Sequence, residues 1–357
     1  MGSLAMLAFC VVGSGGPAAL GSPRRTAASA PAGSAGAFSA VAAVPGSSDV
    51  WAVGYVGAGA ANDSYFVGRL HNGHWQSVKA PRLGGRYGSL DVVTASSATS
   101  VWFGGARQPA HSIQELPAVW RWTGTKFVAA KLPPLFAGAC RVDSISASSA
   151  TNVWAVGSIS TPADNSFVML HYNGKAWSTV AFPEDNDLAP SAVSTSSANN
   201  AWATDGISLY HWNGILWTLD GAAPANVQLN GVATDSPTLA YAAGFNTTSD
   251  QPVIMRFNGK SWSTAVLAKN VPHEVEVSSI TLHGSSAWAV GVREEQPYEP
   301  VILHSTGGVW SAQNSPGKNY VLEAISAGSA THASAVGYRY VGVGEETFFD
   351  YYNGRTW

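Results

Sequence analysis

The stretch "HYNGKAWSTV" (residues 171–180) reads as the end of one β-strand, a tight turn at Asn173-Gly174 and a second strand that opens with Trp177. Asn-Gly between apolar runs is a strong short-range signal for a β-hairpin, because both residues tolerate positive φ. Turns of this kind, each followed by an aromatic residue, recur along the chain as "NGHW" at 72, "TGTKF" at 123, "NGKAW" at 173, "NGILW" at 213, "NGKSW" at 258, "TGGVW" at 306 and "NGRTW" at 353. The hairpin therefore belongs to a repeated unit.

A second repeated element is a short apolar strand that ends near glycine. It occurs as "VWAVG" at 50, "VWFGG" at 101, "VWAVG" at 153, "AWATDG" at 201, "AYAAG" at 240, "AWAVG" at 287 and "ASAVG" at 333. The two elements alternate with a period of roughly 39 to 52 residues, which is typical of propeller blades. Each unit supplies four strands, A to D, which in the third copy are expected at 143–147, 153–157, 167–172 and 177–180. The predicted fold is all-β, a seven-bladed β-propeller of four-stranded antiparallel blades.

The turn also predicts which residues face each other across the C–D hairpin. A two-residue type I′ turn would place Leu170 opposite Trp177. The same spacing predicts Tyr210 with Trp217, Met255 with Trp262, Leu303 with Trp310 and Trp120 with Phe127. The first copy has one residue fewer in its turn, which keeps Leu70 opposite Trp75.

The first 36 residues differ in composition from the repeats. "LAMLAFCVV" (residues 4–12) has the length of a signal-peptide apolar region, and "ASA" (28–30) resembles a cleavage site. We therefore expect 1–36 to be a signal peptide or disordered leader and 37–357 to be the propeller. The basic region of a signal peptide is missing, so a different true start, a trimmed membrane anchor or a lipoprotein signal ending at Cys10 are alternatives. The last copy stops at Trp357, before a full D strand, and predicts an incomplete last blade.

Composition excludes several functional classes. The formal net charge is −3 and Lys and Arg form no run, which argues against a nucleic-acid partner. No segment is apolar over the roughly 18 residues that a membrane span requires, so no span is expected after leader cleavage. Cys140 is the single cysteine after residue 36, so disulfides are not expected. We expect a monomer that is secreted or associated with the cell envelope.

A B strand ending in glycine, followed some 20 residues later by a D-strand tryptophan, resembles the kelch and galactose-oxidase central-domain propellers of secreted bacterial type. The resemblance covers 37–357, and Gly104-Gly105 gives the double glycine of kelch repeats. It implies the fold and raises the question of a copper site made from two His, two Tyr and a Cys. Cys140 lies in a D–A loop, but His273 is the one histidine that plainly precedes an A strand. We therefore expect no cofactor.

The other histidines do not suggest a metal site. His171, His211 and His304 occupy one equivalent position, two residues before the turn, where other copies have Arg121 or Arg256. Residues that are equivalent by repeat lie on different blades and cannot converge on one ion. We interpret these histidines as structural and expect no metal.

Variation between repeats indicates which face carries function. The A–B and C–D turns are short and uniform, whereas the B–C and D–A connections vary, as in "YVGAGAANDSY" (55–65), "VREEQPYEP" (292–300) and "YRYVGVGEET" (338–347). These connections share one side of a propeller, which we call the loop face, and function is expected there. Residues just before the A strands are the candidate ligand-binding set: Arg86, Tyr87, Arg141, Glu274, Glu276, Asn319 and Tyr320.

Charge is unevenly distributed around the predicted ring. The segment 79–141 contains eight Lys or Arg and two acidic residues, while 273–299 contains five Glu and one Arg. Arginine beside aromatic rings suits carboxylated or hydroxylated sugars. The sequence therefore predicts an exported, non-catalytic propeller that binds a glycan, cell-envelope material or a protein partner. The alternative is a carbohydrate-active enzyme, a glycosidase or lyase, that uses carboxylates near the axis, such as Glu274, Glu276 or Glu345.

Overall fold

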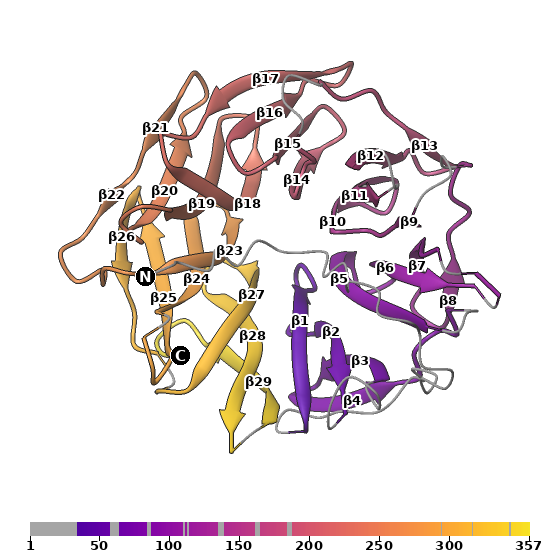
Figure 1. Ribbon diagram of the computed structural model, residues 1–357, viewed down its shortest axis with the longest axis horizontal. Helices are drawn as coiled ribbons and strands as arrows, with labels where there is room; N and C mark the ends of the chain where they lie inside the picture. Colours follow the sequence, from indigo (N-terminus) through magenta and orange to yellow (C-terminus); the bar gives the residue numbers. More distant parts are fainter. Residues whose placement is uncertain are drawn as a thin grey trace.

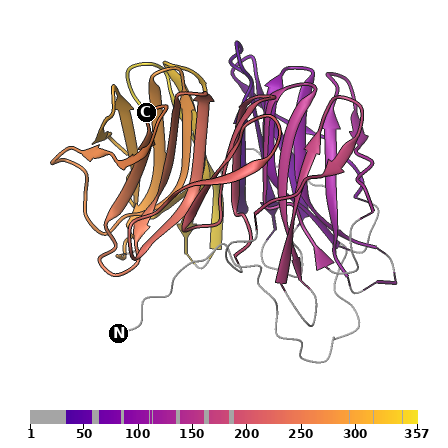
Figure 2. The ribbon, with the colours of Figure 1, turned by 90° about the horizontal axis from the view of Figure 1, so that it is seen from above.

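The computed structural model describes residues 34–57, 64–83, 87–109, 111–112, 114–134, 139–160, 165–183, 188–293, 295–315, 317–342 and 344–357. Seven antiparallel sheets stand around a common axis and follow one another in sequence order (Figure 1). Their strands run between two faces of the ring, which is seen edge-on in Figure 2. The prediction of an all-β, seven-bladed propeller is confirmed.

Blades 1 to 3 follow the A, B, C, D order from the axis outward. Blade 1 consists of β1 (Gly36–Ala43), β2 (Val50–Val56), β3 (Ser64–His71) and β4 (His74–Val78). Blade 2 consists of β5 (Tyr87–Ser97), β6 (Ser100–Gln108), β7 (Leu116–Trp122) and β8 (Phe127–Ala129). Blade 3 consists of β10 (Ser144–Ser149), β11 (Asn152–Ser160), β12 (Asn165–Tyr172) and β13 (Trp177–Thr179), with the short β9 (Ala139–Cys140) paired to β11.

Blades 4 to 6 repeat this order. Blade 4 consists of β14 (Ala192–Ser197), β15 (Asn200–Thr204), β16 (Ser208–Trp212) and β17 (Trp217–Ala222). Blade 5 consists of β18 (Val227–Ser236), β19 (Leu239–Asn246), β20 (Pro252–Phe257) and β21 (Trp262–Thr264). Blade 6 consists of β23 (Glu276–His283), β24 (Ser286–Arg293), β25 (Glu299–Thr306) and β26 (Val309–Ala312), with β22 (Val266–Leu267) added in parallel to β26.

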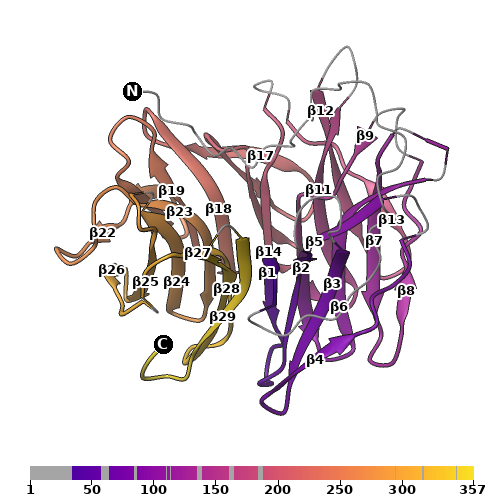
Figure 3. The ribbon, with the colours of Figure 1, turned by 60° about the horizontal axis from the view of Figure 1, so that its bottom comes forward.

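Blade 7 has three strands in the described residues, β27 (Tyr320–Ser329), β28 (His332–Val341) and β29 (Gly344–Tyr352). Blades 7 and 1 lie side by side and close the ring (Figure 3). Ala35 forms an isolated antiparallel bridge with Glu346, and the Thr347 hydroxyl donates to the Ser34 carbonyl. The expected leader otherwise lies outside the described residues, as does most of the segment before β1.

The B strands are buried on both faces, as their unbroken apolar sequences indicate. Trp51, Trp154, Trp202 and Trp288 are each fully buried. Each indole packs between its own blade and the next, because the two faces of a blade are covered by the blades before and after it. The D-strand aromatic residue of the next blade completes this contact, as in Trp154 with Trp217, whose ring centroids are 5.1 Å apart in an edge-on arrangement. The recurrent tryptophans therefore join blades.

The recurrent glycine of the B strand has a steric cause. A Cβ atom on Gly54, Gly105, Gly244, Gly291 or Gly337 would lie 1.8 to 2.2 Å from a carbonyl oxygen of the paired A strand. A Cβ atom on Gly157 would lie 2.2 Å from the carbonyl oxygen of Arg141, which precedes the A strand of blade 3. Real contacts of a Cβ atom are rarely closer than 3.0 Å. Blade 4 has Asp205 at this position.

The serine-rich A strands link successive blades. The Ser144 hydroxyl of blade 3 accepts from the backbone N–H of Val193 in blade 4, and the Ser194 hydroxyl accepts from Thr234 in blade 5. The ring closes in the same way, because the Ser326 hydroxyl accepts from the N–H of Ala43. Backbone groups on the inner edges of the A strands would otherwise lack partners. Serine and threonine at these positions are thus part of the architecture.

The predicted C–D pairing is correct in blade 1 and wrong in the later blades. Leu70 faces Trp75 across the Asn72-Gly73 turn, where both residues have positive φ. The later copies have one more residue between the Asn-Gly or Thr-Gly pair and the aromatic residue. They form four-residue loops in place of the two-residue turn, so the pairing of the C and D strands moves by two residues. The predicted pairs are replaced by Tyr172–Trp177, Trp212–Trp217, Phe257–Trp262, Ser305–Trp310 and Trp122–Phe127.

The side chain of the turn asparagine explains the longer loop. Asn173 Oδ1 accepts from the backbone N–H groups of Lys175 and Ala176. Gly174 has a positive φ of 90°, whereas Asn173 is not among the residues with positive φ. An asparagine that accepts from the backbone in this way stabilises a wider turn than a type I′ hairpin. The Asn-Gly signal therefore located the hairpin correctly but gave the wrong turn type.

Candidate functional site

Arg141 is the best defined of the predicted site residues, and two aspartates neutralise it. Its Nη2 atom lies 2.8 Å from Asp91 Oδ2, and its Nε lies 3.3 Å from Asp143 Oδ1. Burial raises the pKa of Asp143, while the bond from the Ser158 backbone N–H and the charge of Arg141 act in the opposite direction. Asp91 also accepts from the Ser89 hydroxyl. The guanidinium therefore joins blades 2 and 3 at the loop face.

The other predicted residues occupy the loop face near blades 6 and 7. Glu274 has a positive φ of 60° and an exposed side chain 3.6 Å from Arg293. Glu276 begins β23. Asn319 has a positive φ of 66°, and its N–H donates to the Tyr298 carbonyl. These residues form one sector of the loop face.

Tyr320, Tyr87 and Arg86 complete the predicted set. Tyr320 begins β27, and its ring contacts Phe348 with centroids 4.4 Å apart. Tyr87 begins β5 and pairs with Gln108. Arg86 lies outside the described residues. The predicted set is thus divided between two sectors, because Arg141 lies on blade 3 and the described glutamates and Tyr320 lie on blades 6 and 7.

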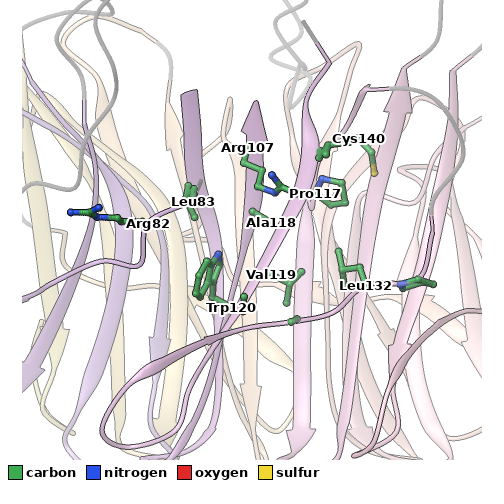
Figure 4. A pocket seen from close by; sticks show the side chains of 13 residues that line it. Arg82, Leu83, Arg107, Pro117, Ala118, Val119, Trp120, Leu132 and Cys140 are labelled. Carbon is green, nitrogen blue, oxygen red and sulfur yellow. The ribbon is translucent and has the colours of Figure 1, made fainter. Parts of the chain in front are cut away.

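A groove on blade 2 has the clearest shape of a ligand site. Its cavity volume is about 510 Å³, within the range of small-molecule sites. Leu83, Ala118 and Val119 form a buried apolar floor, and the half-buried indole of Trp120 forms part of one wall. Figure 4 shows Arg107 extending towards Pro117, with Arg82 at the edge of the groove. We call this site the blade-2 groove.

The groove lies beside the part of β7 that β8 does not cover. β8 pairs only with Trp120 to Trp122, and the last contact beyond it is the bond from the Ala130 N–H to the Val119 carbonyl. The chain then leaves blade 2, so Pro117 and Ala118 have no outer strand beside them. Pro117 lacks an N–H and cannot support a further strand. The open part of β7 is therefore suited to a ligand rather than to strand addition.

The two arginines of the groove have no acidic partner among the described residues. Arg107 is half-buried at the end of β6, and Arg82 is exposed in the connection that precedes β5. Sequence reasoning chose Arg86 and Arg141 instead. The excess of positive charge between residues 79 and 141 included all four arginines, but only the fold could separate paired from unpaired guanidinium groups.

A second cluster lies where blades 6, 7 and 1 meet. We call it the seam cluster, and its members are Tyr55, Tyr298, Glu323, Tyr338, Tyr340 and Glu345. The Tyr55 hydroxyl donates to the Glu345 carboxylate. The Tyr298 and Tyr340 rings stack with centroids 5.1 Å apart, and the Tyr338 and Tyr340 hydroxyls are 3.4 Å apart. Burial raises the pKa of Glu323, and the charge of Glu345 raises it further.

Most of the seam cluster was missed as a site. Three of the variable connections contain Tyr55, Tyr298, Tyr338, Tyr340 and Glu345, but these connections are far apart in sequence. Only ring closure brings blade 7 beside blade 1. The one usable signal was the frequency of tyrosine in connections that were already expected to carry function.

The equivalent histidines have structural contacts. The His171 ring stacks on Trp154 at 4.2 Å, and its Nε2 lies 2.7 Å from Asn152 Oδ1. His211 has the same relation to Trp202 and Asn200. Among the described residues no group of three or more His, Cys, Asp or Glu is placed to hold a metal ion. Cys140 is a buried cysteine at the end of the blade-2 groove.

Comparison with known proteins identifies the fold alone. No protein-family model matches the sequence, and no curated protein matches it. Among solved structures, the chain is similar to YCF48 from Cyanidioschyzon merolae, with 12% identity, coverage of 89% of this chain and 97% of that chain, and a TM-score of 0.57. Within the described residues no helix is long and apolar enough to cross a membrane.

Two further similar structures are carbohydrate-active enzymes. The GH74 xyloglucanase from Xanthomonas campestris shares 15% identity, with coverage of 87% of this chain and 53% of that chain and a TM-score of 0.58. The PL25 ulvan lyase bound to -[GlcA(1-4)Rha3S]- shares 11% identity, with coverage of 94% of both chains and a TM-score of 0.56. At these identities the resemblance is one of architecture.

Proposed function

We propose that this protein is an exported, non-catalytic binding propeller that holds an acidic glycan, such as cell-envelope polysaccharide, at its loop face. The observation that carries the proposal is the blade-2 groove, where Arg107 and Arg82 have no acidic partner among the described residues and line the same groove as the half-buried Trp120. An indole ring offers an apolar face to a pyranose ring. A guanidinium group offers forked donors to a carboxylate or sulfate.

Other observations support this assignment. The volume of the groove, about 510 Å³, suits a small ligand or a short part of a polymer, and its apolar floor would exclude water from one side of that ligand. One solved structure of similar fold, the ulvan lyase, is bound to a saccharide. The relation to kelch and galactose-oxidase central-domain propellers remains part of the proposal, supported by the double glycine of Gly104 and Gly105. So does export, supported by the composition of residues 1–36.

The test is a glycan array followed by titration calorimetry with an acidic oligosaccharide that the array selects. We expect Arg107→Ala and Trp120→Ala each to weaken binding by at least about tenfold, the factor that ~1.4 kcal/mol represents. Arg355→Ala is the matched control, because it removes one exposed arginine from a turn of blade 7. Equal affinity of all three variants for the oligosaccharide would contradict the proposal.

A second arm of this test uses the double substitution of Arg86 and Arg141 by alanine. The sequence predicts that this change abolishes glycan retention. The ion pairs of Arg141 with Asp91 and Asp143 favour a smaller effect, because the charge of Arg141 is already neutralised. Loss of binding in this double variant alone would move the site from the blade-2 groove to blade 3. If no glycan binds, with or without calcium, the result would favour a protein partner at the loop face.

A carbohydrate-active enzyme is the second candidate, and the seam cluster is the observation that favours it. Glu323 has a raised pKa beside the second carboxylate, Glu345, as in pairs of a general acid and a general base. The test is release of reducing ends, or of unsaturated products, from acidic and neutral polysaccharides. Activity that is lost in both Glu323→Gln and Glu345→Gln would favour the enzyme. The absence of turnover would leave the binding proposal.

A further inference from the structure

Six side chains from three blades converge at the seam cluster. Glu323 comes from the A strand of blade 7, Tyr338 and Tyr340 from its B strand, and Glu345 from the start of β29. Tyr55 belongs to blade 1, and Tyr298 lies just before β25 of blade 6. The site is open to solvent, because Tyr340 is 36% exposed and every other member except Tyr338 is partly exposed.

Glu323 lacks the kind of partner that the side chains of its counterparts in blades 2, 5 and 6 possess. The A strands of blades 1, 2, 5, 6 and 7 contain a bulge at the same register, which falls at Ser39, Asp91, Asn230, Ser278 and Glu323. Asp91 accepts from Arg141, Asn230 donates to the Val277 carbonyl, and Ser278 donates to the Leu322 carbonyl. No hydrogen bond or ion pair holds the Glu323 carboxylate within the described residues.

The nearby cations are held by other carboxylates. Arg293 lies 2.9 Å from Glu299, and Lys318 lies 2.6 Å from the same residue. Arg339 is paired with Glu346, next to Glu345 in sequence. The described part of the seam cluster therefore contains two carboxylates and four phenol rings and no positive charge. The nearest arginines and lysine are already neutralised.

Aromatic rings beside carboxylates favour a particular class of ligand. The faces of tyrosine rings attract cations, and the attraction increases when water is excluded. The Tyr298 and Tyr340 rings stack on each other, while Tyr338 stands at 88° to Tyr340 and forms a corner with it. A divalent metal would require several oxygen ligands, and the described residues contain no suitable group. An organic ammonium group suits both the rings and the carboxylates.

We propose that the seam cluster is a second binding site, which takes an organic ammonium group between the tyrosine rings and the carboxylates of Glu323 and Glu345. The site is independent of the acidic-glycan proposal, because it lies on other blades and takes the opposite charge. An ammonium group could belong to a free amino sugar or to a lysine side chain, and both present the same cation. The positive charge of the ammonium group would supply Glu323 with the partner that it lacks among the described residues.

The experiment measures binding to the full chain by calorimetry with small probes. Glucosamine is compared with N-acetylglucosamine, and Nα-acetyl-lysine amide with its Nε-acetylated form, so that each pair differs in the ammonium group. We expect the amine of at least one pair to bind at least about tenfold more tightly than its acetylated form. The pair with the larger difference identifies the source of the ammonium group.

Variants then assign the binding to these residues. Glu323→Gln and Glu345→Gln should each weaken binding of the amine by at least about tenfold. Glu346→Gln is the matched control, because it removes the same charge from the adjacent position outside the cluster. Thermal unfolding of each variant checks the fold. If Glu345→Gln unfolds the ring, Glu323→Gln still tests the site, because Glu323 has no hydrogen bond within the described residues to lose.

Three results would overturn the inference. Equal binding of amines and acetylated forms would indicate a site for neutral sugars or peptides. Equal weakening by all three glutamine variants would indicate attraction to overall charge. Absence of binding for every amine would leave the seam cluster as a structural closure of the ring. None of these results bears on the blade-2 groove, which is tested with acidic glycans.

Discussion

Replacing Gly244 with alanine should damage blade 5 through a backbone collision. A Cβ atom there would lie 1.8 Å from the Gln228 carbonyl oxygen and 2.8 Å from Leu229 Cα. Ordinary contacts of a Cβ atom begin at 3.4 Å, so β18 would have to retreat by about 1.6 Å, the difference between that distance and the first of these. Backbone cannot rotate away as a flexible side chain can.

The cost follows from what that movement breaks. β18 pairs with β19 through Leu229 and Gly244, and Asn230 donates to the Val277 carbonyl of blade 6 over 2.8 Å. Loss of about two hydrogen bonds costs ~1 kcal/mol each, and overpacking adds ~1 to 3 kcal/mol. We expect a decrease of about 3 kcal/mol in the free energy of unfolding. For a chain of this length that corresponds to a Tm lower by about 4 °C.

The assay is thermal unfolding followed by circular dichroism, with the urea midpoint as a second measurement. Gly344→Ala is the control, because the nearest atom to its added Cβ is 3.9 Å away, and its stability should change by less than about 0.5 kcal/mol. If Gly244→Ala unfolds within 1 °C of the control, on the order of experimental error, the recurrent glycine does not have the steric role assigned to it.

Three other changes test the packing between and within blades. Asp205→Gly should destabilise blade 4 by about 2 kcal/mol in urea unfolding, because the carboxylate accepts from the Ile207 and Ser208 N–H groups and the Tyr210 hydroxyl; no loss would contradict this. Trp217→Ala should cost about 3 to 5 kcal/mol, and a smaller loss than for Trp262→Phe would argue against its role beside Trp154. Burial lowers the pKa of three stacked histidines in the folded protein. Their contribution to the free energy of unfolding is therefore complete above the ordinary histidine pKa near 6.5, and it is lost as the pH falls through the folded-state pKa. The Tm should therefore be lower at pH 5.5 than at pH 7.5, and His171→Gln should reduce that difference; the three residues are His171, His211 and His304.

The local signals in the sequence were sufficient for the architecture. The alternating tryptophan strands and Asn-Gly turns gave seven hairpins, the order of strands within a blade and the burial of the B strands. They also gave the structural nature of His171 and its equivalents. These features depend on contacts within one blade or on the same contact repeated between neighbouring blades. Each copy of the repeat therefore supports the interpretation of the other copies. The register of the later hairpins failed because one additional residue in the turn lets Asn173 accept from two backbone N–H groups.

The candidate sites depend on contacts that no repeat encodes. Arg141 and Arg107 lie in the same basic segment, yet among the described residues only Arg141 is paired with aspartates, Asp91 of blade 2 and Asp143 of its own connection. The blade-2 groove lies where β8 has ended at Ala129 and part of β7 is exposed, and its lining also comes from segments before β5 and after β8. Tyr55 and Glu345 are separated by 290 residues and meet only when the ring closes.

The sequence by itself determined that seven similar hairpins must stack, because period and apolar pattern act over a few residues and repeat along the chain. The tertiary structure alone decided which charges are neutralised and which remain available, because Coulomb interactions and hydrogen bonds depend on distance in space. Residues from the two ends of a ring become neighbours only through closure. Function in this protein is therefore a property of the places where blades differ, and its location follows from the fold.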